Sequence, residues 1–282
     1  MKTRRALLFL LCANLFSQPL RIVSTAPSIT ELLYALGLGD RVAGVTRFCR
    51  YPPEAQKKPK IGDYDNPNLE AIASLKPDLV IIQTNPVRLA ERLRAVHLKV
   101  LEIDQQDVAA IYRSIRMVGD AAGTSAQAAE LIGHIRAGLD SVRARSAGFK
   151  RTQMMLVVGR TPGRLDGLIV VGRASYLNEV IEIAGGENVF HDARAAYPQV
   201  SLEEVIARNA EVIVDMGDMG DNVAVSPEQV REVIALWQRA SSVRAVRQHR
   251  IFPIAPDGFL VPGPRVVDAA RALLAMLHPE SK

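Results

Sequence analysis

Cysteine, histidine and aromatic residues are all scarce in this chain of 282 residues. The two cysteines and five histidines show no spacing that is typical of a zinc site, so a metal centre is not predicted. Aromatic residues make up 5% of the chain, with one tryptophan. No glycine-rich phosphate loop and no Gly-x-Ser-x-Gly nucleophile motif occurs. The sequence therefore predicts a protein that is not an enzyme and that carries no resident cofactor.

Cys49 is the one cysteine outside the N-terminal segment, so an internal disulfide is not predicted. Its neighbours Arg47 and Arg50 would lower the pKa of its thiol and make it more reactive. No histidine lies close to it in the sequence to act as a partner base. A catalytic cysteine is therefore disfavoured.

Lysine and arginine exceed aspartate and glutamate by 35 to 30, which gives a net charge of +5 and an isoelectric point near 9.4. The basic residues are scattered, and no aromatic residues are interleaved with them in a stripe. Nucleic-acid binding is therefore not predicted.

The first 19 residues resemble a secretory signal peptide. Lys2, Arg4 and Arg5 precede the apolar run ALLFLLCANLF, which is too short to cross a bilayer. The segment predicts export to the periplasm. Cys12 is a poor lipidation site because bulky Leu11 precedes it, so a free and a lipid-anchored mature form both stay open.

The two halves of the chain repeat one pattern of strands and helices. Asn68-Leu69-Glu70 and Ser201-Leu202-Glu203 each start a short amphipathic helix followed by a β-branched strand, at an offset of 203 − 70 = 133 residues. Ile22 and Met155, in the first strand of each half, obey the same offset. Strands that alternate with helices predict parallel sheets. The fold expected is α/β, with two Rossmann-like lobes of parallel strands.

A long amphipathic helix is predicted between the two halves, over 124–148. Ala128, Leu131, Ile135, Leu139 and Val142 recur three or four residues apart and would form one apolar face. A helix of this length would span about 33 Å at 1.5 Å per residue. The organisation expected is an N-terminal lobe over 20–122, a linking helix over 123–148 and a C-terminal lobe over 149–282. In the first lobe, the spacing of Ser28 and Glu31 predicts a capping box.

Aromatic and acidic residues gather in loops that follow predicted strands. Phe48 and Tyr64 lie in such loops of the first half, and Tyr197 precedes Glu203 by six residues as Tyr64 precedes Glu70. Asp257 and Phe259 follow the last predicted strand. Ligands bind at the carboxyl ends of parallel strands, so these loops predict a cleft with aromatic walls. The alternative is that the two tyrosines only anchor their loops.

Glu70 and Glu203 would each lie in the first turn of a helix, where the helix dipole favours a carboxylate. Helix stability alone would explain either residue. Their paired occurrence predicts, in addition, one exposed acidic site on each lobe.

These features resemble the substrate-binding proteins of bacterial ABC importers, in the class whose two lobes are joined by a single helix. Members of that class capture cobalamin, haem or ferric siderophores. The resemblance runs from Arg21 to the end of the chain and is strongest to the cobalamin-binding proteins. It is carried by RIVSTAPSITE, Tyr51-Pro52-Pro53-Glu54, Asn68-Leu69-Glu70 with LKPDLVI, Gly185-Gly186-Glu187-Asn188-Val189-Phe190 and Pro198-Gln199-Val200-Ser201.

The resemblance implies a periplasmic protein, expected to be a monomer, that delivers cobalamin or a related corrinoid to the importer. The residues that it places at the ligand are Phe48, Tyr64, Gln83, Tyr197, Asp257 and Phe259. Gln83, Tyr64 and Tyr197 stand where the family pattern has tryptophan. Glu70 and Glu203 match the two glutamates that meet arginines on the ABC permease dimer.

Two alternatives to a corrinoid-binding protein stay open at this point. The ligand of the same class of protein would be haem, with Tyr64 or Tyr197 as an axial oxygen ligand, or a ferric siderophore. A more distant alternative is an enzyme that holds a metal cluster between two such lobes, for which the chain offers Cys49 and scattered histidines.

Overall fold

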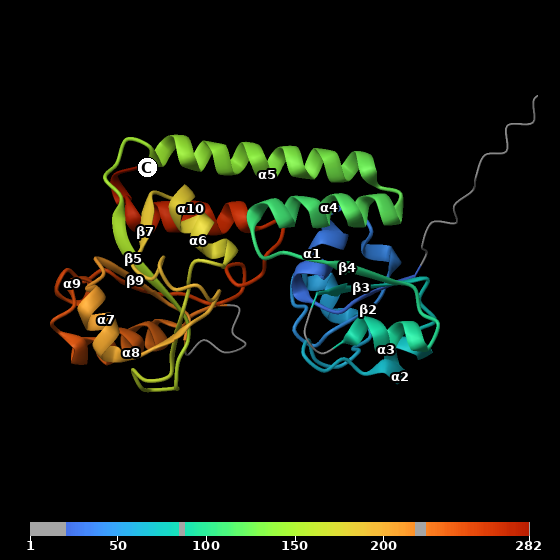
Figure 1. Ribbon diagram of the computed structural model, residues 1–282, viewed down its shortest axis with the longest axis horizontal. Helices are drawn as coiled ribbons and strands as arrows, with labels where there is room; N and C mark the ends of the chain where they lie inside the picture. Colours follow the sequence, from blue (N-terminus) through green and yellow to red (C-terminus); the bar gives the residue numbers. More distant parts are fainter. Residues whose placement is uncertain (1–20, 85–87, 218–223, 282) are drawn as a thin grey trace, which may run out of the picture.

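The computed structural model describes residues 21–84, 88–217 and 224–281. The predicted signal peptide lies outside these residues. Figure 1 shows two α/β lobes side by side, with helix α5 (Ser125–Ser146) running across both of them. We call the part that holds β1 to β4 the N-terminal lobe and the part that holds β5 to β10 the C-terminal lobe.

The N-terminal lobe contains one sheet with the strand order β2-β1-β3-β4, and every pair in it is parallel. Its strands are β1 (Ile22–Ser24), β2 (Val42–Val45), β3 (Leu79–Gln83) and β4 (Val100–Ile103). Its helices are α1 (Pro27–Ala35), α2 (Leu69–Ser74), α3 (Leu89–Ala95) and α4 (Val108–Ala122), with 3₁₀ turns η1 (Gly39–Arg41) and η2 (Pro53–Lys57). The parallel sheet predicted for this half is confirmed.

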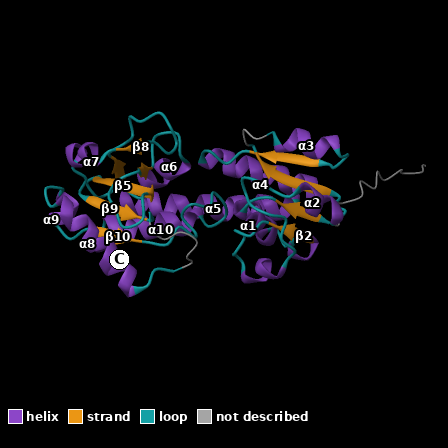
Figure 2. Cartoon of the chain, turned by 90° about the horizontal axis from the view of Figure 1, so that it is seen from below, coloured by secondary structure: helices purple, strands orange, loops and turns teal. Residues whose placement is uncertain are grey.

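The C-terminal lobe contains a sheet with the order β10-β9-β5-β6-β8, and β7 pairs with β5. Its strands are β5 (Thr152–Gly159), β6 (Leu168–Val170), β7 (Gly186–Asn188), β8 (Gln199–Val200), β9 (Val212–Asp215) and β10 (Ile251–Pro253). Its helices are α6 (Tyr176–Ile183), α7 (Leu202–Arg208), α8 (Pro227–Trp237), α9 (Arg244–Arg247) and α10 (Val266–Leu277), with 3₁₀ turns η3 (Gln238–Ala240) and η4 (Pro279–Ser281). Figure 2 shows the strands of both lobes enclosed by helices.

The internal repeat predicted from the sequence is visible in the topology. The parallel run β1-β3-β4 corresponds to β5-β9-β10, and α2 and α7 occupy the same place in each lobe. The prediction that the second sheet is parallel throughout was wrong, because β6 is antiparallel to both β5 and β8. The chain reverses between β5 and β6 through Gly163 and Gly167, whose φ angles of 69° and 60° favour glycine.

The predicted capping box at Ser28 was also wrong. Pro27 occupies the first turn of α1 and Ala26 is the N-cap residue, so Ser28 lies inside the helix. Its hydroxyl donates to Gln105 Oε1 at 2.7 Å, and Glu31 binds Arg265. Tertiary partners therefore take both side chains, and both partners lie at the boundary between the lobes.

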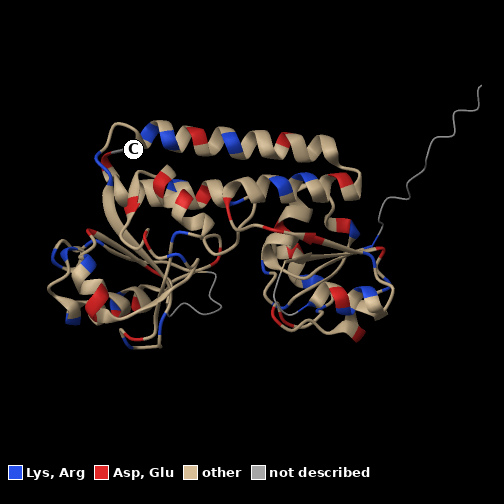
Figure 3. Cartoon of the chain, in the orientation of Figure 1, with Lys and Arg blue, Asp and Glu red and all other residues tan. Residues whose placement is uncertain are grey.

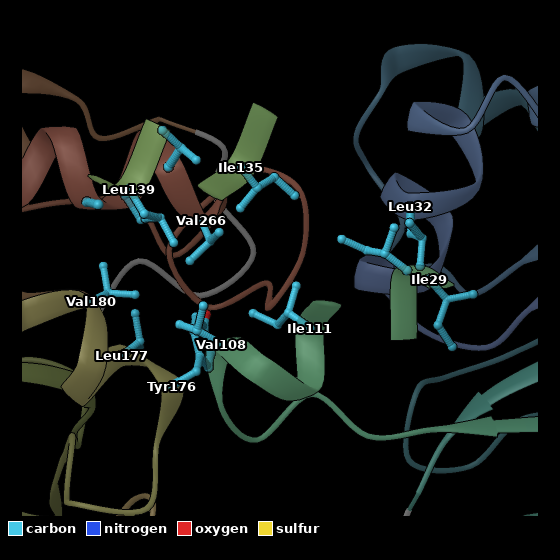
Figure 4. Packing of buried hydrophobic residues seen from close by; sticks show 14 of the residues in the cluster. Ile29, Leu32, Val108, Ile111, Ile135, Leu139, Tyr176, Leu177, Val180 and Val266 are labelled. Atoms are coloured by element: carbon cyan, nitrogen blue, oxygen red, sulfur yellow. The ribbon is translucent and has the colours of Figure 1, made fainter. Parts of the chain in front are cut away.

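Helix α5 joins the two lobes through one continuous hydrophobic core. It packs against α4 in the N-terminal lobe and against α6 and α10 in the C-terminal lobe. The core cluster around it extends from Ile29 and Leu32 of α1 to Val180 of α6 and Val266 of α10, with Ile135 and Leu139 of α5 within it (Figure 4). The apolar face predicted for this helix is thus present, although Leu131 is only partly buried.

Two glycines let the helices of this core approach closely. A Cβ at Gly119 of α4 would lie 2.5 Å from the Cβ of Ala128 on α5. A Cβ at Gly138 of α5 would lie 2.6 Å from Cγ1 of Val267 on α10. Valine in a helix has essentially one χ1 rotamer, so Val267 has little room to give way.

Substitution of Gly138 by alanine is predicted to destabilise the protein. The added methyl group overpacks the contact between α5 and α10, and overpacking of this kind costs about 1–3 kcal/mol. The measurement is the midpoint of denaturant unfolding, compared with that of the unmodified protein.

Gly133→Ala is the matched control, because Gly133 lies on the same helix and a Cβ placed there would have no other atom within 4 Å. Alanine there should stabilise the protein by about 0.5–1 kcal/mol through helix propensity. Equal effects of the two substitutions would contradict the close contact at Gly138.

Candidate ligand-binding site

A cavity of about 990 Å³ lies between the two lobes. The N-terminal lobe contributes Ala26, Pro27, Ser28, Phe48, Arg50, Tyr64, Asp65, Gln83, Thr84, Ile103, Asp104, Gln105 and Gln106. The C-terminal lobe contributes Ala174, Ser175, Tyr176, Ala196, Tyr197, Pro256, Asp257, Leu260, Val261 and Pro262. Because both lobes supply its wall, a molecule held here would contact both.

The topology explains why these residues meet. Gln83 is the last residue of β3, Gln105 follows β4, and Asp257 follows β10. All three therefore lie at the carboxyl ends of parallel strands, where α/β sheets bind ligands. The cleft predicted at these strand ends is present.

The structure brings most of the residues predicted for the site together. Phe48, Tyr64, Gln83, Tyr197 and Asp257 line the cavity. The ring of Phe259 instead packs against the main hydrophobic core, and the backbone carbonyl of Phe259 accepts a hydrogen bond from the Tyr176 hydroxyl. Phe259 thus holds the last loop in place rather than forming part of the cavity wall.

A network of polar side chains forms one part of the wall in the N-terminal lobe. The Tyr64 hydroxyl donates to Gln83 Oε1 at 2.6 Å. Gln83 Nε2 donates to Ser28 Oγ at 2.9 Å and to Gln105 Oε1 at 2.7 Å. Gln105 is 6% exposed, so the network continues from the cavity surface into the interior of the lobe.

Tyr64 and Tyr197 project from opposite lobes and are 39% and 44% exposed. Partial burial raises the pKa of Tyr64, and the nearby Tyr197 phenol raises it further. Burial also raises the pKa of Tyr197, although a hydrogen bond from the Ser175 hydroxyl, at 3.2 Å, opposes this. Both phenols are therefore neutral at pH 7, and each offers a ring face together with a polar hydroxyl.

A partly buried ion-pair cluster crosses between the lobes beside the cavity. Arg265, the residue before α10, donates through Nε to Glu31 Oε2 of α1 at 2.9 Å and through Nη2 to Glu31 Oε1. Its Nη1 donates to Asp257 Oδ2 at 3.1 Å, and its guanidinium lies 4.2 Å from the centre of the Tyr51 ring. Burial raises the pKa of Glu31, against the opposing effect of Arg265.

The cavity wall carries more acidic than basic side chains. Asp65, Asp104 and Asp257 line it, together with Arg50. Glu31 and Arg265 lie behind the wall and largely balance one another. An anionic ligand would therefore meet a net negative wall.

Cys49 does not have the environment that its neighbours in sequence predict. Its thiol is 1% exposed, and it contacts the hydroxyls of Thr30 and Thr46 at 3.1 and 3.2 Å. Burial raises the pKa of the thiol. The prediction that Arg47 and Arg50 would lower this pKa was therefore wrong, because the chain folds the thiol into the core.

Glu70 and Glu203 are both exposed and lie in the first turns of α2 and α7. Asn68 and Ser201 cap these helices, with Asn68 Oδ1 accepting from Ala71 N and Ser201 Oγ accepting from Glu204 N. The backbone N–H of Glu203 and the Ser201 hydroxyl lower the pKa of Glu203. Both helices lie on the side of the molecule away from α5 (Figure 1).

Sequence reasoning missed several residues of the site. Gln105 follows the strand KVLEID. The rule that ligands bind at the carboxyl ends of parallel strands, which predicted Asp257, therefore applies to Gln105 as well. Arg265 and Tyr176 had no such signal, because their roles depend on how the two lobes dock. Within residues 21–84, 88–217 and 224–281, no cluster of histidine, cysteine and carboxylate side chains could hold a metal ion.

The two lobes, the single linking helix and the cavity between them define a solute-binding protein of the two-lobed, helix-linked class. Residues 22–257 match the periplasmic binding protein family, and the chain belongs to this family. Members of this kind are substrate-binding proteins of ABC transporters and not enzymes. None of the helices in the described part of the chain is long and apolar enough to cross a membrane.

Relatives in this family have more than one ligand. The chain is 30% identical to the vitamin B12-binding protein of Photorhabdus laumondii, over 94% of this chain and 90% of that protein. The solved periplasmic vitamin B12-binding protein BtuF of Vibrio cholerae is 25% identical, with a TM-score of 0.78 over 94% of this chain and 99% of that one. The periplasmic heme-binding protein RhuT of Roseiflexus is 27% identical, with a TM-score of 0.79 over 93% and 99%.

Substitution of Arg265 by methionine is predicted to lower the stability of the protein by about 3 kcal/mol. The change leaves Glu31, which is 4% exposed, as a buried carboxylate without its cation. Denaturant unfolding of the purified variant measures the effect.

Arg271→Met, within the helix α10 that Arg265 precedes, is the control. Arg271 forms an exposed ion pair with Asp268 at 3.4 Å, and such pairs contribute about 0–1 kcal/mol. A loss at Arg265 no larger than the loss at Arg271 would show that the interlobe ion pair does not stabilise the fold.

Proposed function

We propose that this protein captures cobalamin or a related corrinoid outside the cytoplasm and delivers it to an ABC importer. The observation that carries the proposal is the cavity between the lobes, whose wall combines Phe48, Tyr64 and Tyr197 from both sides. Its volume of about 990 Å³ lies at the upper end of the roughly 300–1,000 Å³ range of ligand pockets. Aromatic side chains on opposite walls suit a large flat macrocycle, which they can contact through their ring faces.

The charge of the wall supports a corrinoid over haem. The periphery of a corrin ring in cobalamin carries neutral carboxamides, whereas haem carries two propionates. Asp65, Asp104 and Asp257 face the cavity with Arg50, and this acidic excess disfavours two additional carboxylates. Neutral amides can instead hydrogen-bond with Gln83 and the tyrosine hydroxyls.

Haem is the second candidate, because Tyr64 and Tyr197 both reach the cavity and offer phenol oxygens as axial ligands. Such ligation uses the phenolate. Burial raises the pKa of both tyrosines, so the iron would have to displace a proton that the site retains. This favours the tyrosines as contact surfaces for a corrin ring. A ferric siderophore would meet the same pair of hydroxyls.

Calorimetric titration of the purified mature protein with cyanocobalamin is predicted to show saturable binding of one corrinoid per protein. Phe48→Ala should weaken it at least tenfold, because an aromatic contact and its buried area are lost. Calorimetry is preferable to fluorescence, since the single tryptophan, Trp237, is fully buried in the C-terminal lobe away from the cavity wall.

The same titration with haemin is the control. The proposed ligand would be haem instead of a corrinoid under two conditions. Haemin would bind with a phenolate-to-iron charge-transfer band, and cyanocobalamin would not bind at tens of micromolar. The fold and the cavity would then stand, and the tyrosines would become iron ligands.

We further propose that Glu70 and Glu203 bind arginines on the two halves of the permease. Each glutamate is exposed at the start of a helix, and the two helices occupy equivalent places in the two lobes. The spacing of the pair is set by α5, which holds the lobes together. Figure 3 shows acidic and basic residues interspersed over both lobes.

The double substitution Glu70→Ala and Glu203→Ala is predicted to leave corrinoid affinity unchanged and to reduce uptake by cells at least tenfold. Uptake of radiolabelled cyanocobalamin and calorimetry of the purified variant measure the two effects. Glu228→Ala, in the exposed first turn of α8, is the control for loss of a helix-terminal carboxylate. Undiminished uptake in the double variant would remove the docking assignment.

A further inference from the structure

The buried end of the Gln83 network contains a donor without an acceptor. Gln105 Oε1 accepts from both Ser28 Oγ and Gln83 Nε2, at 2.7 Å each. Gln105 Nε2 is buried and has no hydrogen-bond partner among the described residues. A buried N–H group without an acceptor is rarer and more costly than a buried carbonyl with a free lone pair.

Exchanging the nitrogen and oxygen positions of the two carboxamides gives this buried N–H group an acceptor. If the carboxamides of Gln83 and Gln105 are both turned by half a turn, Gln105 Nε2 donates to Ser28 Oγ and to the Gln83 oxygen. The Ser28 hydroxyl then donates to that oxygen as well. Every contact of the network keeps its length and its donor–acceptor match, and the group without a partner becomes the Gln105 carbonyl.

The reversal also changes what Tyr64 presents to the cavity. The Gln83 amide now donates to the Tyr64 hydroxyl, across the contact of 2.6 Å. The phenol proton is no longer needed inside the network. Tyr64 lines the cavity and is 39% exposed, so its O–H can point to a ligand.

We propose that Gln83 and Gln105 are positioning residues that turn the Tyr64 hydroxyl outward, so that Tyr64 donates a hydrogen bond to a neutral carbonyl oxygen of the ligand. The ligand named here rests on the proposed function: the acceptor is a peripheral carboxamide of a corrinoid. The network selects a ligand with a hydrogen-bond acceptor at this point of its rim.

The orientation of the amides can be measured without any ligand. In ¹⁵N-labelled protein, the side-chain amide protons of Gln105 should give a stronger nuclear Overhauser effect to the β protons of Ser28 than those of Gln83 do. The opposite ranking would overturn the proposed orientation. This readout depends only on the folded protein.

Binding of cyanocobalamin tests the role of Tyr64. Tyr64→Phe removes one neutral hydrogen bond and should weaken binding about fivefold. Gln105→Glu puts a carboxylate, which only accepts hydrogen bonds, at the buried end of the network. The Gln83 amide must then donate to this carboxylate, so the Gln83 oxygen faces Tyr64 and Tyr64 donates to it. Gln105→Glu should therefore weaken binding by a similar factor, and Tyr64→Phe should add less than twofold in that background.

Gln106→Glu reports the effect of the added charge alone, because Gln106 is exposed beside Gln105 on the cavity wall. Losses that multiply fully in the double variant, or a Gln105→Glu loss equal to the Gln106→Glu loss, would overturn the positioning role. No binding of cyanocobalamin to the unmodified protein would overturn the proposed function and the corrinoid acceptor with it. The amide orientation would then still be decided by the nuclear Overhauser measurement.

Discussion

The structure depends on the continuous hydrophobic core along α5. A two-lobed protein could have two separate cores with a strand or loop between them, and its lobes would then move freely. Here Ile135 and Leu139 of α5 share one core cluster with α1 in the first lobe and α6 in the second. Gly119 and Gly138 let α5 pack closely against α4 and α10, with no room for a side chain at either contact. The distance between the lobes, and with it the width of the cavity, is therefore fixed largely by packing.

Polar contacts at the boundary of the lobes reinforce this arrangement. Val108 N, at the start of α4, donates to Glu179 of α6 at 3.3 Å, so a side chain of one lobe satisfies an N–H at the helix start of the other. Arg265 joins Glu31 to Asp257, and Asp257 lines the cavity. A ligand that hydrogen-bonds with Asp257 thus acts on an ion-pair cluster that spans both lobes. Asp257 belongs both to the cavity wall and to the ion-pair cluster between the lobes.

The sequence predicted those parts of the fold that local pattern determines. The period of the apolar residues predicted α5, and the matching patterns NLE and SLE predicted α2 and α7 in equivalent places. The antiparallel β6 was missed because its turn glycines, Gly163 and Gly167, have no signal that distinguishes a hairpin from a loop. Ser28 and Glu31 have the spacing of a cap but form tertiary contacts, which local spacing does not encode. Likewise, the neighbours of Cys49 in the sequence predict a reactive thiol, whereas its burial in the fold raises the pKa of the thiol and makes it less reactive.

The binding site shows the same limit of prediction from local sequence patterns. Loop position predicted that Phe48, Tyr64, Tyr197 and Asp257 belong together, since each follows a strand or precedes an equivalent helix. Gln83 was expected there only from the family resemblance, which gave no account of what an amide does at this place. The structure supplies one, because a glutamine at the end of β3 reaches Ser28, Gln105 and Tyr64 at once. An indole at this position could stack on a ligand but could not hydrogen-bond with all three partners, because it offers one N–H donor and no acceptor. The amide of Gln83 therefore makes this part of the cavity wall a hydrogen-bonding surface.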